Sequence, residues 1–116
     1  MRWANMVVLD TSLLIDILRG NPDISHFIED LDKSSEEKCV AAISVMELYF
    51  GALQSNKKDK INSVMSLLGS LILLNFDFKS AIESSEIKNE LVKKGLIIDL
   101  EDIMIAGIAK TNKQKL

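Results

Sequence analysis

The sequence predicts an α/β fold with three layers, in which helices cover both faces of a central parallel sheet. Short apolar runs alternate along the chain with longer segments whose apolar residues recur at helical spacing. The apolar runs are continuous, as expected of strands that are covered on both faces. A chain of 116 residues with no Gly/Ser-rich linker and no internal repeat is expected to form one domain, residues 1–116.

Four apolar runs are the expected strands. Residues 6–9, 39–43 and 71–74 form the first three, and a fourth run at 96–98 is short and ambiguous. Helical spacing and end signals predict six helices. They cover 13–18, ending at Gly20; about 22–31; from about Ser44 to 52; 61–68, ending at Gly69; from Asp77 as N-cap to Gly95; and about 100–111.

The charge and cysteine content limit the classes of function. The net charge of −3, from 14 basic and 17 acidic residues, argues against binding nucleic acid by bulk electrostatics. Bound divalent cations can nevertheless bridge acidic side chains to phosphate. The only cysteine, Cys39, cannot form an internal disulfide and is expected to be a buried apolar residue. With no apolar segment long enough to span a bilayer, we expect a cytoplasmic protein and no membrane partner.

Asp10 is the first candidate site residue, because it directly follows the first apolar run. In open parallel sheets, ligands bind beyond the carboxyl ends of the strands. The alternative role for Asp10 is to cap the following helix, but Thr11 and Ser12 are able to do so in its place.

Glu47 is the second candidate, one turn into the helix after the second apolar run. Its structural alternative is a capping box, in which Glu47 folds back onto the backbone N–H of Ser44. Gly51 lies one turn further along the same face. It clears space beside Glu47 that suits either a ligand or close packing.

Asp102 is the third candidate, at the head of the last helix. Asp99 is expected to be the N-cap of this helix, and acidic residues in a first turn interact favourably with the helix dipole. Asp102 shares its face with a stripe of small and apolar residues, so it should point towards the sheet, whereas Glu101 should face solvent. The stripe comprises Ile105, Ala106 and Ala109.

Asp10, Glu47 and Asp102 are therefore expected to meet at one edge of the sheet, within about one metal-coordination shell of each other. Hard cations such as Mg²⁺ or Mn²⁺ prefer carboxylate and water oxygens, and they promote phosphodiester hydrolysis. With a single histidine, His26, and a single cysteine, the chain cannot assemble a zinc site from these residue types.

Three segments resemble the motifs of the PIN-domain nucleases, and specifically of the VapC-like toxins of toxin–antitoxin pairs. Each motif alone is degenerate, but the three occur in order at family-like spacing over nearly the whole chain. They are Val8-Leu9-Asp10-Thr11-Ser12 with Leu14-Ile15 and Leu18-Arg19-Gly20; Ser44-Val45-Met46-Glu47-Leu48 with Gly51; and Leu91, Gly95, Asp102, Ile105-Ala106 and Ala109.

The resemblance implies a Mg²⁺- or Mn²⁺-dependent endoribonuclease that is inhibited by an antitoxin protein and is often a homodimer. It implies that Asp10, Glu47 and Asp102 are the catalytic acids and metal ligands, with Asp10 and Asp102 holding the metal. Thr11 or Ser12 would support the site by hydrogen bonding. The family adds a fourth acid after one further strand. Because the sequence ends where that strand should begin, we expect the C-terminal strand to be missing and activity to be weak. The first strand should then have an apolar edge that is covered by a second subunit or by residues beyond Leu116.

Two classes of alternative are weighed against this prediction. The main alternative is a catalytically impaired PIN-like module that only binds an antitoxin partner. A haloacid-dehalogenase-like phosphatase resembles an Asp-x-Asp pattern, but position 12 is Ser. A receiver domain is expected to carry paired acids before its first helix, whereas Asp10 stands alone.

Overall fold

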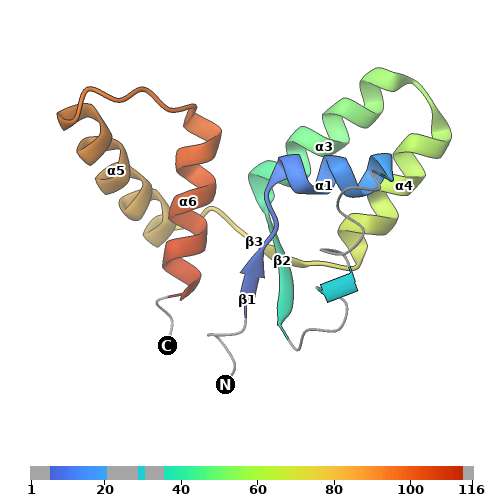
Figure 1. The fold of residues 1–116 in the computed structure, drawn as a ribbon, viewed down its shortest axis with the longest axis horizontal. Coiled ribbons are helices and arrows are strands. Elements are labelled where there is room, and N and C mark those ends of the chain that lie inside the picture. The colour runs from blue at the N-terminus through green and yellow to red at the C-terminus, as the bar shows by residue number, and fades with distance from the viewer. Residues whose placement is uncertain (1–5, 21–28, 31–35, 114–116) are drawn as a thin grey trace.

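The computed structural model describes residues 6–20, 29–30 and 36–113 and contains a parallel sheet between two groups of helices (Figure 1). The strands are β1 (Met6–Val8), β2 (Glu37–Ala41) and β3 (Ile72–Leu74), in the order β1-β2-β3. Both pairings are parallel, with Val8 opposite Cys39 and Cys39 opposite Ile72. The predicted α/β class is confirmed.

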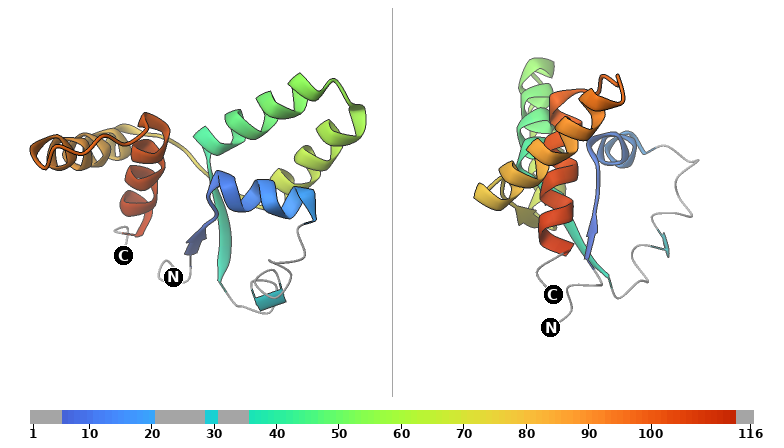
Figure 2. Two further views of the ribbon diagram at one scale, coloured as in Figure 1. Left: turned by 45° about the horizontal axis from the view of Figure 1, so that its top comes forward. Right: turned by 90° about the vertical axis from the view of Figure 1, so that its left-hand side faces the viewer.

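Helices lie on both sides of this sheet (Figures 1 and 2). One group consists of α1 (Thr11–Arg19), α3 (Ala42–Ser55) and α4 (Lys58–Gly69). The other consists of α5 (Phe78–Lys93) and α6 (Leu100–Lys113). The helix expected over residues 22–31 falls almost entirely outside the described residues.

The two faces of the sheet have separate hydrophobic cores, which explains the continuous apolar runs. On β2, Val40 belongs to one core, whereas Cys39 and Ala41 belong to the other, and none of the three is more than 1% exposed. Leu14 of α1 packs in the first core and Ile108 of α6 in the second. The inner part of this central strand, residues 39–41, is accordingly apolar at every position.

Several predicted element ends are confirmed. Gly20 ends α1 with a φ of +64°, a left-handed conformation that glycine adopts readily. Asp77 is the N-cap of α5, and its side chain accepts a hydrogen bond of 2.9 Å from the backbone N–H of Ser80.

Two sequence predictions about elements need correction. The second strand covers Glu37–Ala41 rather than 39–43, because α3 already begins at Ala42. Residues 96–98 are a connecting segment and not a strand. Ile97 is 98% exposed, and its apolar neighbours Leu96 and Ile98 are about half exposed, so no second layer covers this run. The short run is apolar without being part of either core.

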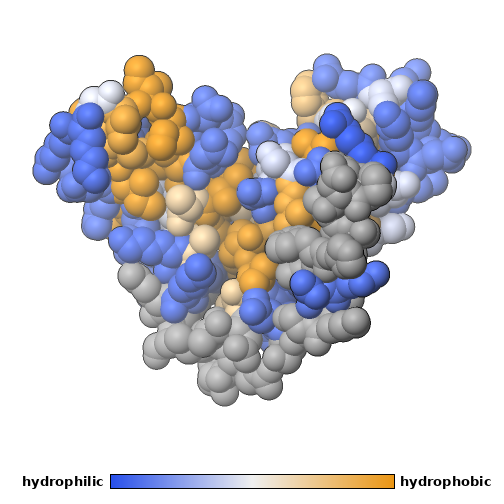
Figure 3. Space-filling model, viewed as in Figure 1, coloured by the Kyte–Doolittle hydropathy of each residue, from blue (hydrophilic) through white to orange (hydrophobic). Residues whose placement is uncertain are grey.

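The two helices of the second group pack closely against each other. Gly107 of α6 is buried against α5, where an added Cβ would lie 2.8 Å from the backbone oxygen of Ser80 and would collide with the hydroxyl of Ser84. The hydroxyl of Ser84 donates a 3.3 Å hydrogen bond to the carbonyl of Ile103. We call this pair of helices the α5–α6 arm. In the space-filling view a notch separates it from α1, α3 and α4, and apolar residues gather on it (Figure 3).

Within the described residues, β1 pairs only with β2, so one side of its backbone is an edge. The expectation of an exposed apolar edge is wrong for the side chains, because Met6 is 8% exposed and Leu9 is 4% exposed. Both side chains pack in the cores described above. Coverage of the backbone edge by a second subunit stays a prediction. None of the described helices is long and apolar enough to cross a membrane.

Candidate metal-binding active site

A pocket of about 470 Å³ lies just beyond β1, between α1, α3 and the start of α6. It brings together residues from three segments that are far apart in the sequence. We call it the acidic pocket. It is lined by Asp10, Thr11, Ser12, Glu47, Asp99, Asp102, Ile105 and Ala106. All three predicted acids and both predicted supporting residues therefore border one cavity; their chemical roles stay predictions.

Asp10 lies at the mouth of this pocket as the N-cap of α1. Its Oδ1 accepts a 2.8 Å hydrogen bond from the backbone N–H of Leu13. The expectation that Thr11 or Ser12 caps the helix in its place is therefore wrong. The capping bond occupies one carboxylate oxygen and fixes the orientation of the group. The exposed carboxylate keeps its other oxygen for a ligand.

Thr11, and not Ser44, positions Glu47. The hydroxyl of Thr11 donates a 2.8 Å hydrogen bond to Oε1 of Glu47 and lies 2.9 Å from the hydroxyl oxygen of Ser44. The capping-box alternative is wrong, because α3 begins at Ala42 with Ala41 as its N-cap. Ser44 is consequently inside the first turn and fully buried. Glu47 is thus tied to α1, 36 residues earlier in the chain.

Asp102 and Glu101 differ in the structure by their place relative to the pocket, and their different roles stay a prediction. Asp102 lines the acidic pocket together with Ile105 and Ala106, whereas Glu101 is exposed and does not line it. The expectation that Asp102 points at the sheet is corrected, because this residue is exposed at the pocket.

Asp99 is a fourth carboxylate at the acidic pocket, which the sequence interpretation treated only as a helix cap. Its carbonyl oxygen accepts a 3.2 Å hydrogen bond from the N–H of Ile103, as expected at an N-cap. Asp99, Asp102 and Ala106 are spaced by three and four residues and so share one helical face. That spacing is a signal in the sequence that could have identified Asp99 as a site residue.

The donor set suits a hard divalent cation, since all four titratable residues at the acidic pocket carry carboxylate oxygens. The expected approach within one coordination shell is not present. Among the residues that the structure describes, no three Asp, Glu, His or Cys side chains are close enough together to hold a metal ion. Mg²⁺ is commonly bound through one or two carboxylates and several waters, so the residues fit this cation without a three-carboxylate cluster.

The one cysteine does not contribute to this site. Cys39 of β2 is a free thiol, fully buried in the core that also contains Ile108. Burial raises the pKa of Cys39, and the nearby charge of Glu37 raises it further. The thiol therefore stays protonated, in agreement with its predicted role as an apolar residue.

Comparison with known proteins identifies the family and agrees with the fold. The family model of the PIN domain matches residues 7–116. Ribonuclease VapC3 of Methanocaldococcus jannaschii is 38% identical over 87% of this chain and 95% of its own length. The tRNA(fMet)-specific endonuclease VapC of Salmonella typhimurium is 31% identical over 88% of this chain and 76% of its own length.

A solved structure gives the same result. The VapBC complex of Salmonella typhimurium bound to DNA superposes with a TM-score of 0.80 at 31% identity, covering 88% of this chain and 76% of that one. The chain belongs to the PIN-domain family and, within it, to the VapC ribonucleases. The predicted family and nuclease class are confirmed.

Proposed function

We propose that this chain is a divalent-metal-dependent endoribonuclease, the toxin of a toxin–antitoxin pair, with Asp10, Glu47 and Asp102 as its catalytic acids. The observation that carries the proposal is the acidic pocket, where these residues and Asp99 meet between three segments. The pocket supplies carboxylate oxygens, which are the ligands that a hard divalent cation prefers. The names of the relatives support RNA as the substrate.

Asp10 and Asp102 are the proposed metal-holding residues, with Mg²⁺ or Mn²⁺ as the cation. A bound divalent cation would activate water and neutralise the charge that develops on the phosphate during hydrolysis. Asp10 offers the oxygen that its capping bond leaves free. Asp102 is in the first turn of α6, where the positive end of the helix dipole reduces repulsion among the acids.

Glu47 and Asp99 have supporting roles in this proposal. Thr11 holds one oxygen of Glu47, so that the carboxylate can orient water at the metal. Such a bond to a charged acceptor is among the stronger hydrogen bonds in proteins. Asp99 lies one helical turn before Asp102 and adds negative charge at the same edge. It is the residue in the described chain best placed to substitute for the fourth acid of the family.

The proposed partner is an antitoxin protein, supported by solved structures of toxin–antitoxin complexes with the same fold. A homodimer is proposed because one backbone edge of β1 pairs with no strand in the described part of the chain. We infer a cytoplasmic location, because a lone buried thiol is typical of reducing compartments and the proposed substrate is RNA. Residues 1–116 are proposed to act as one domain.

The test compares Asp102→Asn with Glu101→Gln, adjacent changes that each remove one negative charge. Cleavage of RNA in Mg²⁺ or Mn²⁺ should fall at least about 100-fold in Asp102→Asn, as expected for loss of a group that acts on the reacting atoms. Glu101→Gln should retain activity, and circular dichroism should show both variants folded. Equal losses in the two variants would refute the assignment of Asp102.

The alternative, a module that binds its antitoxin without cutting RNA, is favoured by one observation, the lack of a preformed three-acid cluster among the described residues. Isothermal calorimetry with Mn²⁺ separates the two functions. Mn²⁺ binding and RNA cleavage that are both lost in Asp10→Asn support the nuclease. No Mn²⁺ binding and no cleavage by a folded chain would favour the module.

A further inference from the structure

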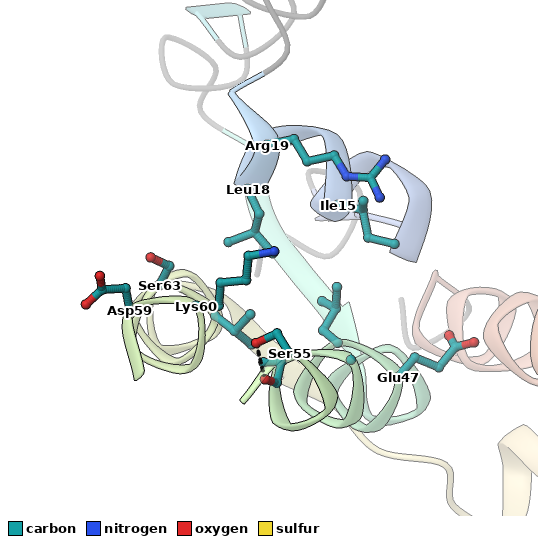
Figure 4. A pocket seen from close by; sticks show the side chains of 12 residues that line it. Ile15, Leu18, Arg19, Glu47, Ser55, Asp59, Lys60 and Ser63 are labelled. Atoms are coloured by element: carbon teal, nitrogen blue, oxygen red, sulfur yellow. Dashed lines mark hydrogen bonds between the residues drawn. The ribbon is translucent and has the colours of Figure 1, made fainter. Parts of the chain in front are cut away.

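A second pocket, of about 360 Å³, lies between α1, α3 and α4 (Figure 4). Its volume is at the small end of the range of ligand sites, about 300–1,000 Å³. We call it the α1–α4 groove. Its apolar lining comes from all three helices and comprises Ile15, Leu18, Leu48, Ala52 and Val64.

The α1–α4 groove adjoins the acidic pocket, because Glu47 lines both of them. Gly51, one turn beyond Glu47 on α3, also lines the groove, and a Cβ added there would meet no atom within 4 Å. The space beside Gly51 is therefore open. The groove and the acidic pocket meet at Glu47, which belongs to the lining of both.

The lining of the groove includes two cationic side chains and two carboxylates, Glu47 and Asp59, whereas the acidic pocket is lined by four carboxylates and, among the described residues, by no cation. Arg19 comes from the last turn of α1 and Lys60 from the first turn of α4. In Figure 4, Lys60 reaches from α4 towards α1, where Arg19 lies, whereas Asp59 points away from the space between the helices. In residues 6–20, 29–30 and 36–113, neither cation forms an ion pair.

We propose that the α1–α4 groove binds the nucleotide next to the scissile phosphate, with Arg19 and Lys60 holding its phosphate and the aliphatic floor covering its base and ribose. The inference rests on the proposed ribonuclease function. An acidic pocket repels RNA except where a metal intervenes, so the neighbouring phosphate needs cations from the protein. Arg19 and Lys60 supply them beside Glu47, in a cavity sized for one nucleotide of a single strand.

Fluorescence anisotropy of a labelled single-stranded oligouridylate, about eight nucleotides long, tests the proposal. Binding is measured in EDTA with Asp102→Asn as the background, so that the RNA stays intact. Arg19→Gln and Lys60→Gln should each lower the affinity by about fivefold, the loss expected for one exposed charge pair. Each should also reduce the slope of log affinity against log salt by about 0.7, the value for one contact on a single strand.

Lys58→Gln is the matched control, because Lys58 is exposed on the same turn of α4 and does not line the groove. It should change the affinity less than about twofold. Equal losses in Lys58→Gln and Lys60→Gln would overturn the proposal in favour of nonspecific electrostatics. Unchanged RNA binding in both groove variants would also overturn it, and would leave the groove to a peptide segment of the antitoxin.

The outcome is separate from that of the proposed function. Groove-dependent RNA binding by a chain that never cleaves RNA would uphold the inference and refute the nuclease. If Asp102→Asn abolished cleavage while substitutions of Arg19 and Lys60 left RNA affinity unchanged, the nuclease would be upheld and the inference about the groove refuted.

Discussion

Two helical glycines should respond in opposite directions to the same substitution. Gly107→Ala places a Cβ 2.8 Å from the backbone oxygen of Ser80 and against the hydroxyl of Ser84. The hydroxyl can rotate, but the backbone oxygen moves only if α5 moves as a whole. Overpacking of this kind costs about 1–3 kcal/mol, while alanine gains about 1 kcal/mol in helix propensity over glycine. The net effect is a loss of up to about 2 kcal/mol in the free energy of unfolding.

Gly51→Ala is the control for this prediction, because its Cβ meets no atom within 4 Å and only the propensity term remains. It should raise the free energy of unfolding by up to about 1 kcal/mol. Urea unfolding followed by circular dichroism measures both changes. Stabilisation by Gly107→Ala, or equal shifts of the two midpoints, would refute the close approach of α5 and α6.

Three further predictions follow from the site and the core. Thr11→Val removes the hydroxyl that holds Glu47, so RNA cleavage should fall about tenfold, as for loss of one hydrogen bond to a charged group; Thr11→Ser should keep most of the activity, and equal losses in both would contradict the role of that bond. Burial raises the pKa of Cys39 above that of the unfolded chain, so this thiol's contribution to stability is complete below about pH 8.5 and declines as the pH rises towards the folded-state pKa. Cys39→Ala should abolish that part of the decline. The measurement is the free energy of urea unfolding as a function of pH in the wild type and the variant; parallel pH profiles would contradict the prediction. Mn²⁺ should raise the melting temperature of the wild type, because the ion binds only the folded chain, and should leave that of Asp10→Asn unchanged; equal shifts would place the metal elsewhere.

Local patterns predicted most of the elements. The apolar runs at β1 and β3 are strands, as their composition predicted, and Gly20 and Asp77 end and begin helices through bonds within a few residues. Residues 96–98 have the same local composition as a strand, but no neighbouring strand pairs with them in the described part of the chain. Composition does not encode such a partner.

The candidate site was predictable as a location but not in its bonding. Parallel strands carry their carboxyl ends to one edge, so Asp10, Glu47 and Asp102 were expected together. The partner of Glu47 was assigned wrongly, because a capping box can be read within four residues, whereas the contact with Thr11 spans 36. Asp99 was missed because a carboxylate at an N-cap already has a sufficient structural explanation.

The acids of the pocket come from two groups of helices that pack against the same sheet. Asp10 and Glu47 lie at the start of α1 and in α3, whose side chains pack in the first core. Asp99 and Asp102 lie at the start of α6, in the α5–α6 arm. A cation that binds both pairs of acids would therefore link the two groups of helices, as a covalent cross-link does. The angle of the arm then sets the spacing of the metal ligands. A larger side chain at Gly107, which does not itself line the pocket, should change metal affinity without altering a ligand.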